Sequence, residues 1–144
     1  MAITTAKGTA LKMSDSGSPG VGSNIAQVRS ISGPTVKPNT VDVTTHDTVG
    51  FWRRKIAVLI DPGNLSFEIN FDYLEATHAY ATGLWNQMIG LVKTGIEMIF
   101  PNSAGALKFQ CYVSQHDFNV PVDNVLSVKI QLDITDAITG SLTP

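Results

Sequence analysis

The sequence predicts a mainly β protein, a β-sandwich or barrel with one flanking helix. Residues 65–72, 107–114 and 126–134 alternate between apolar and polar side chains, the pattern of strands with one buried face. Only residues 74–93 or so change to the three- and four-residue apolar spacing of an amphipathic helix. Strands that follow one another without alternating helices argue against a doubly wound parallel sheet.

Length and composition favour a single domain over residues 1–144 that associates with other proteins. The chain has 144 residues, of which only 15% are charged, against about 25% in ordinary soluble domains. A surface with few charges suits burial in protein interfaces, because charge is depleted at interface cores. The net charge of −2 gives no overall basic footprint for nucleic acid. The single cysteine rules out an internal disulfide and fits a reducing compartment of synthesis.

The N-terminal part predicts a short strand at residues 9–13, followed by a flexible Gly/Ser-rich loop at residues 14–23. The start of the chain lacks the basic and apolar regions of a signal peptide. Because no apolar run approaches the roughly 18 residues of a membrane span, we expect no membrane binding by this chain. A further strand is predicted at residues 25–32, ended by Gly33-Pro34.

The central part predicts a strand at residues 41–44 and then a long inter-strand loop, about residues 45–64. This loop ends in Asp61-Pro62-Gly63-Asn64, in which proline and glycine supply the backbone angles of a tight turn.

The predicted helix is capped near Asp72 and stopped by Thr94-Gly95. Its apolar stripe is Ala76, Ala79, Tyr80, Leu84, Met88 and Leu91. Strands at residues 96–100, 107–114 and 126–134 complete six or seven expected strands. Trp85 lies one turn from Met88, which predicts that the two pack together.

Histidine is the residue type that most strongly suggests chemistry. His46-Asp47 and His116-Asp117, together with His78, would suffice in number for a metal site or an acid–base pair. Neighbouring residues on a strand point to opposite faces, however, so a His-Asp dipeptide does not place both groups on one ion. No Gly-x-Ser-x-Gly is present, and Cys111 falls on the apolar phase of its strand. We therefore expect no enzyme activity, cofactor or metal.

The predicted loop holds the one cationic cluster of the chain beside two aromatic residues. One interpretation is stacking and pairing with single-stranded nucleic acid. The other, which the composition favours, is an interface in which the aromatics are anchors and the arginines pair with carboxylates such as Asp42. The candidate inter-subunit contacts are His46, Asp47, Phe51, Trp52, Arg53, Arg54, Lys55 and Asp61.

Taken in order, these segments resemble the tail tube (major tail) proteins of long, non-contractile-tailed bacteriophages. The resemblance runs from about residue 25 to residue 135. It is carried by Ser30–Pro34, Val41–Asp47, Ile60–Gly63 leading into Leu65–Asp72, Ala76–His78, Phe100-Pro101 and Pro121–Asp123.

The resemblance implies a structural subunit that forms hexameric rings, which stack into a hollow tube around a tape-measure protein. It also implies contacts with tail-tip or baseplate and tail terminator proteins, and passage of double-stranded DNA into the host. The subunit would be made in the host cytoplasm and reside in the virion, with the long loop and N-terminal arm bridging subunits. Some relatives append an immunoglobulin-like domain, which this chain is expected to lack. The alternative is a ring or tube protein of a related bacterial injection system, similar to type VI secretion.

Overall fold

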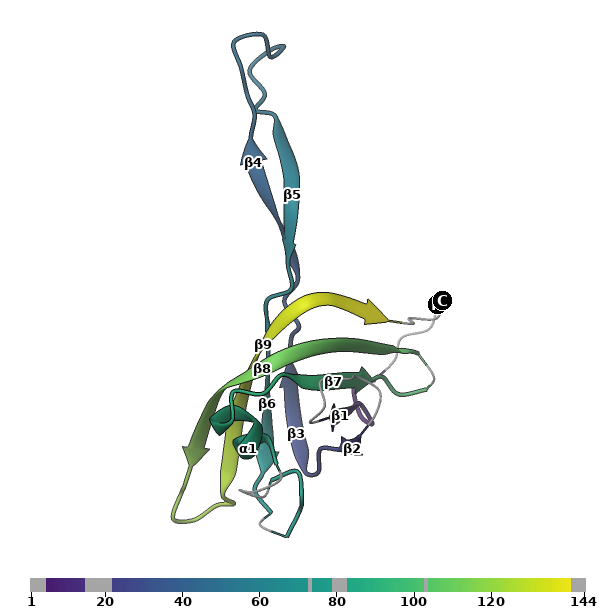
Figure 1. The fold of residues 1–144 in the computed structure, drawn as a ribbon, viewed down its shortest axis with the longest axis vertical. Coiled ribbons are helices and arrows are strands. Elements are labelled where there is room, and N and C mark those ends of the chain that lie inside the picture. Colours follow the sequence, from purple (N-terminus) through teal and green to yellow (C-terminus); the bar gives the residue numbers. More distant parts are fainter. Residues whose placement is uncertain (1–4, 15–21, 73, 79–82, 103, 141–144) are drawn as a thin grey trace.

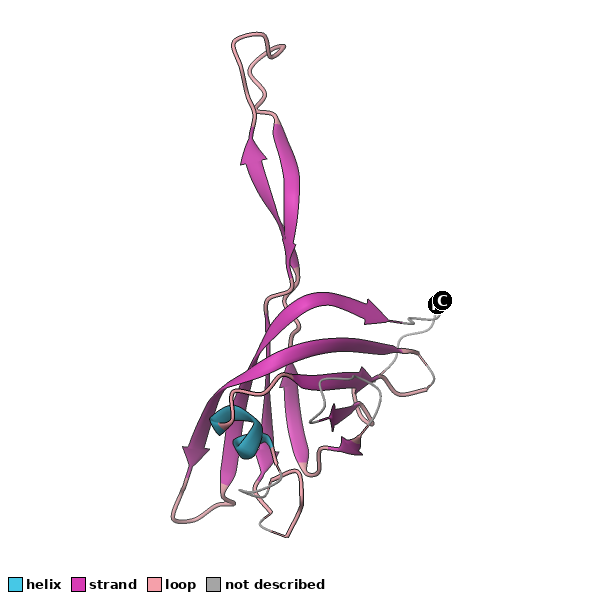
Figure 2. Ribbon diagram, in the orientation of Figure 1, coloured by secondary structure: helices cyan, strands magenta, loops and turns pink. Residues whose placement is uncertain are grey.

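The computed structural model describes residues 5–14, 22–72, 74–78, 83–102 and 104–140, which form a mainly β protein (Figures 1 and 2). One seven-stranded antiparallel sheet has the strand order β2-β1-β7-β8-β9-β6-β3 and curls into a half-barrel; β4 and β5 pair separately. The predicted fold class is confirmed. The elements are β1 (Ala10–Ser14), β2 (Ser23–Asn24), β3 (Val28–Ser32), β4 (Lys37–Asp42), β5 (Lys55–Asp61), β6 (Asn64–Asn70), α1 (Leu84–Ile89), β7 (Thr94–Ile99), β8 (Ala106–Asn119) and β9 (Ser127–Gly140).

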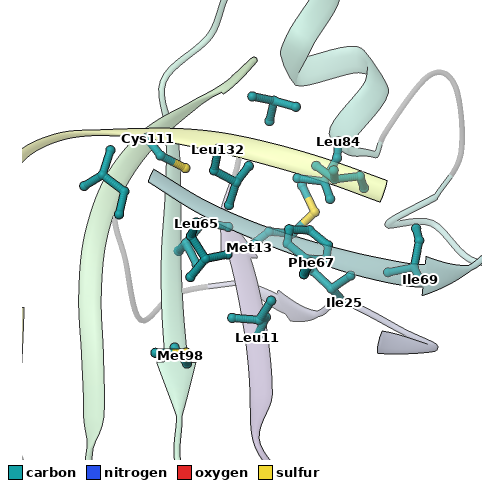
Figure 3. Close-up of a cluster of buried hydrophobic side chains, with 14 of the residues drawn as sticks. Leu11, Met13, Ile25, Leu65, Phe67, Ile69, Leu84, Met98, Cys111 and Leu132 are labelled. Atoms are coloured by element: carbon teal, nitrogen blue, oxygen red, sulfur yellow. The ribbon is translucent and has the colours of Figure 1, made fainter. Parts of the chain in front are cut away.

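The core lies on the inner face of the curled sheet (Figure 3). In β6 the alternation predicted from the sequence holds: Leu65, Phe67 and Ile69 are at most 2% exposed. Phe67 lies opposite Ile130 of β9 on one side and Ile31 of β3 on the other. Burial of one apolar face of the sheet is therefore the main source of stability for this body.

The helix is much shorter than the predicted range 74–93. Among the described residues it covers only Leu84–Ile89, between a Gly83 in extended conformation and Gly90. Both glycines had been placed inside the predicted helix, where glycine is about 1 kcal/mol less favourable than alanine. Here they mark its two ends instead.

The predicted helix ends are also wrong. The Asp72 carboxylate accepts a hydrogen bond from the backbone N–H of Leu74 (3.0 Å), so it stabilises a local turn and does not cap α1. Thr94 and Gly95 do not stop a helix, because they are the first residues of β7. Residues 79–82 of the predicted helix lie outside the described part of the chain.

The predicted loop at residues 45–64 is in large part a strand. β5 occupies Lys55–Asp61 and pairs with β4 from Asp42 opposite Lys55 to Lys37 opposite Asp61. β4 also includes Lys37–Asn39, ahead of the strand predicted at residues 41–44. We call residues 35–62 the arm and residues 43–54, which join β4 to β5, the arm tip. Neither face of this two-stranded ribbon is buried, so the apolar alternation that normally reveals a strand is not required.

Other strand limits differ by a few residues. The strand predicted at residues 25–32 begins only at Val28, because Gln27 has a positive φ of 60°. β8 and β9 have 14 residues each and extend beyond their predicted limits. Of the predicted loop at residues 14–23, positions 15–21 lie outside the described residues, while Ser14 and Ser23 belong to β1 and β2.

Candidate functional site

The arm extends away from the body along the longest axis of the molecule (Figure 1). Glycines at its base allow the chain to pass from one sheet to the other. Gly63 has φ +72°, and a Cβ at this position would lie 1.9 Å from the Thr35 carbonyl oxygen, so no larger residue fits. The Asp61 carboxylate accepts the Gly63 N–H at 2.9 Å. The predicted turn at residues 61–64 is thus present, and it joins two sheets.

The arm tip has local structure of its own. The Arg54 N–H donates to Thr44 Oγ1 at 2.8 Å, and the Val43 N–H donates to the Arg54 carbonyl at 2.9 Å. These bonds continue the pairing of β4 and β5 beyond their last ladder residues. The Thr45 N–H donates to Thr48 Oγ1 at 3.0 Å and closes a turn.

All eight candidate contact residues lie in the arm. His46 through Arg54 are in the tip, and Lys55 and Asp61 are the first and last residues of β5. Arg53 Nη1 lies 3.8 Å from Asp42 Oδ2 of the same chain, with both side chains largely exposed. An exposed ion pair of this kind contributes little stability, so Arg53 remains available to another partner. Its predicted pairing across subunits stays a prediction.

The aromatic residues of the tip are not covered by any part of the described chain. Phe51 is 106% exposed and Trp52 is 83% exposed. The rest of the arm is also apolar, with Val36, Val41, Val43, Val49, Ile56, Val58, Leu59 and Ile60 all exposed. Exposed apolar side chains in this number along one segment are typical of an interaction site.

A second feature lies in the part of the body away from the arm, where α1 packs against β8 (Figure 1). It is a cavity of about 210 Å³. Its lining includes Phe71, His78, Trp85, His116, Phe118 and Ile130. The Trp85 ring lies edge-on to that of His116 with centroids 5.3 Å apart, and 5.9 Å from that of Phe118. The lining is therefore mainly apolar and includes three aromatic residues and two histidines, an arrangement that favours further aromatic contacts.

The two histidines of the cavity differ in their hydrogen bonds. His78 Nδ1 accepts the backbone N–H of Asp72 at 3.0 Å, so its Nε2–H donates to the Ala26 carbonyl at 2.8 Å. It therefore ties the segment after β6 to the segment before β3. The buried His116 Nδ1 has no hydrogen-bond partner. Burial lowers the pKa of His116 from 6.5 to about 4, because the charged ring is poorly solvated.

Residue types alone do not place His116 and Phe118 on the inner face of the sheet. Up to Val113, odd-numbered residues of β8 point inward. The pairing with β9 shifts between Val113 and Gln115, after which His116 lies opposite Ile130 and Phe118 opposite Val128. A one-residue shift exchanges the two faces of a strand. In the sequence, the only sign of this shift is that the apolar alternation of β8 breaks after Val113.

The His-Asp dipeptides lie far apart. His46-Asp47 is in the arm tip, whereas His116-Asp117 is on β8, with His116 partly buried and Asp117 exposed. Within the described ranges no three potential metal ligands come together. The expectation of a non-catalytic, metal-free protein therefore stays a prediction.

Cys111 is fully buried, as its position on the apolar phase predicts. Burial, together with the charge of Asp133, raises the pKa of its thiol to about 12, so it behaves as a small apolar residue.

The described segments contain no helix that is long and apolar enough to cross a membrane.

We expect the free energy of unfolding of the monomer to fall between pH 6.5 and pH 4. Because the folded pKa of His116 is below its usual value, the unfolded chain binds the proton first, and stability present above pH 6.5 is lost as the pH falls. With solvent screening of the partly exposed ring, the loss is about 1 kcal/mol. Urea titrations at pH 7 and pH 4.5 measure it. His116→Phe should reduce this difference, and an unchanged difference would contradict the assignment.

Comparison with solved structures finds close likenesses over nearly the whole chain. A chain from the virion of a native gene transfer agent particle superposes with a TM-score of 0.74 at 17% identity, covering 96% of this chain and 99% of that one. A chain from the tail of an empty gene transfer agent particle, refined helically with C6 symmetry, gives 0.72 at 21% identity, covering 99% and 100%.

A chain from an extracellular contractile injection system, in a structure of the PVC sheath/tube terminator in the extended state, gives a TM-score of 0.73 at 13% identity. The match covers 98% of both chains. No known family matches the sequence, and no curated protein matches it either. At these identities the likeness establishes a shared fold, which is the fold found in phage-like tail and injection assemblies.

Proposed function

We propose that this chain is a structural subunit of a phage-like tail, forming hexameric rings that stack into a hollow tube. The observation that carries the proposal is the match of the whole fold to a chain from a tail refined with six-fold symmetry. The match covers the entire length of that chain and 99% of this one.

The surface of the molecule supports the same conclusion. A tube subunit needs apolar or weakly charged faces that other copies cover, since burial of apolar area is the main favourable term in association. The arm supplies exposed apolar side chains on both of its faces. The large sheet also has an exposed edge at β3, and unpaired strand edges readily pair with other chains.

The proposal extends to partners and location. The tube would enclose a tape-measure protein and end at tail-tip or baseplate and tail terminator proteins. It would then carry double-stranded DNA as part of the virion. A chain with net charge −2 suits such a conduit, because a strongly basic bore would bind phosphates and retard the DNA. We propose no catalytic activity and no cofactor.

A second candidate is the tube of a bacterial injection system that delivers proteins. The likeness to a chain from an extracellular contractile injection system favours it. Tubes of phage origin are expected to polymerise to long lengths, whereas the injection-system alternative predicts isolated rings from the purified protein.

Negative-stain electron microscopy of the purified protein over a range of concentrations, with its solution mass, tests the proposal. We expect monomers at low concentration and hollow tubes at high concentration. A protein that stays monomeric at millimolar concentration, with neither rings nor tubes, would contradict it.

A further inference from the structure

We propose that the arm tip of one copy inserts Trp52 into the cavity beneath α1 of the next copy, so that successive rings are joined by an aromatic plug. This inference rests on the proposed function and adds the partner and the residues of the ring-to-ring contact. Trp52 of the arm tip would contact Phe71, His78, Trp85, His116 and Phe118 of the neighbouring copy.

The volume of the cavity suits one aromatic side chain. A dry apolar cavity of about 150 Å³ holds a benzene ring, and this cavity measures about 210 Å³. One aromatic side chain larger than benzene fits, which favours the indole of Trp52 over the ring of Phe51. The aromatic residues of the lining then add edge-to-face contacts to the burial of the indole.

Exposed aliphatic side chains lie in the segments that adjoin the lining of the cavity. Around the cavity, the segment after β6 and the β8–β9 loop expose Leu74, Val120, Val122 and Val125 to solvent. Phe51, next to Trp52, would lie against these aliphatic side chains. An anchor in a pocket with an apolar surround that excludes water is the usual arrangement of an interface hot spot.

The arm tip and the segments around the cavity carry opposite net charge. Residues 42–55 contain three basic residues and two acidic residues, Asp42 and Asp47. Residues 70–78 and 115–127, which include lining residues of the cavity, contain no lysine or arginine. They contain four carboxylates, of which Asp117 lies opposite Lys129 on the outer face of β8, so Asp72, Glu75 and Asp123 remain for the rim. A cationic tip facing an anionic rim fixes the orientation of the contact and disfavours tip-to-tip pairing.

The occupant of the cavity is the arm tip of a second copy of this chain. The arm tip extends along the longest axis away from the body (Figure 1), and the cavity is lined by residues of α1, β6, β8 and β9 in that body, so a chain cannot fill its own cavity. A contact between different surfaces of identical subunits is head-to-tail, so a stack of copies keeps a free arm tip at one end and a free cavity at the other. Repeated in each ring, it propagates in one direction along the tube.

Photo-cross-linking tests the contact directly. Benzoylphenylalanine at position 52 keeps an aromatic ring in the tip, and we expect irradiated tubes to give cross-links to residues 69–78, 84–88 and 116–130 of another copy. The control is the same amino acid at position 112, on the outer face of β8, which should not link to those segments. Cross-links from position 52 to other segments would overturn the inference and leave the tube function standing.

Substitution of the plug gives an independent test. Trp52→Ala should raise the concentration at which tubes appear by roughly 30-fold, the effect of losing an interface hot spot of about 2 kcal/mol. Val49→Ala is the matched control, since Val49 lies in the same tip and is 89% exposed; its effect should stay below about threefold. Normal polymerisation of Trp52→Ala would overturn the inference.

A substitution in the lining of the cavity tests the other side of the contact. Val128→Phe places a ring in the cavity from its inner wall and should also block polymerisation; because Val128 is only 1% exposed, a lower melting temperature of the monomer is expected with it. Tubes at the wild-type concentration would overturn the inference, and if this variant does not fold, the cross-links decide. Wild-type protein that never forms rings or tubes would overturn the proposed function together with this contact.

Discussion

Replacement of residues 43–54 by Asn-Gly is expected to abolish tube formation and leave the body folded. Asp42 and Lys55 are directly paired, so a two-residue turn between them closes β4 and β5 as a regular hairpin. The arm tip makes no contribution to the core, and the melting temperature of the monomer should change by no more than about 2 °C. Electron microscopy and thermal denaturation measure the two effects.

This replacement is cleaner than deletion of residues 48–57 from the predicted loop. That deletion would remove Lys55, Ile56 and Ala57 from β5 and disturb its register with β4. A Gly/Ser loop of unchanged length in place of residues 43–54 is the matched control. It should fail as well, because it keeps the reach of the tip and removes its side chains. Tubes formed by the Asn-Gly variant would exclude the arm tip from assembly.

Phe67→Ala is expected to destabilise the monomer by about 3–5 kcal/mol, the range for truncating a large aromatic residue in a packed core. Phe67 is 2% exposed and packs between β3 and β9 on the inner face. Since whole domains are stable by only about 5–15 kcal/mol, the variant should be close to unfolding at 37 °C. Urea denaturation of the monomer measures the loss.

The matched control is Leu59→Ala on β5, where the side chain is 71% exposed. Its effect on monomer stability should stay within about 0.5 kcal/mol, as for surface substitutions in general. An equal loss in both variants would mean that the arm and the body unfold as one unit and that the arm is packed in solution. A loss confined to Phe67→Ala supports a stable body with an independent arm.

Prediction from the sequence succeeded where one face of a strand is buried. β6 and β9 were recognised because core burial forces strict alternation, as at Leu65, Phe67 and Ile69. It failed at β5, where neither face is buried and Ile56 to Ile60 form a continuous apolar run. It also failed for the helix, because side-chain spacing does not show where the chain leaves the helical conformation at Gly83 and Gly90.

The candidate site was found only in part for a similar reason. Phe51, Trp52 and the basic residues beside them are candidate interface residues from residue types alone, and their role stays a prediction. The cavity was not predicted, because His116 and Phe118 turn inward through a shift in strand pairing that depends on β9.

The sequence by itself therefore determined the fold class, the core strands and the composition of the arm tip, since these follow from local periodicity and residue chemistry. Only the tertiary structure decided that the long connection is a projecting hairpin and that a cavity with aromatic residues in its lining lies in the part of the body away from it. Both depend on which strands pair and in which register. Such pairing is set by contacts between segments distant in the sequence, which local patterns do not encode.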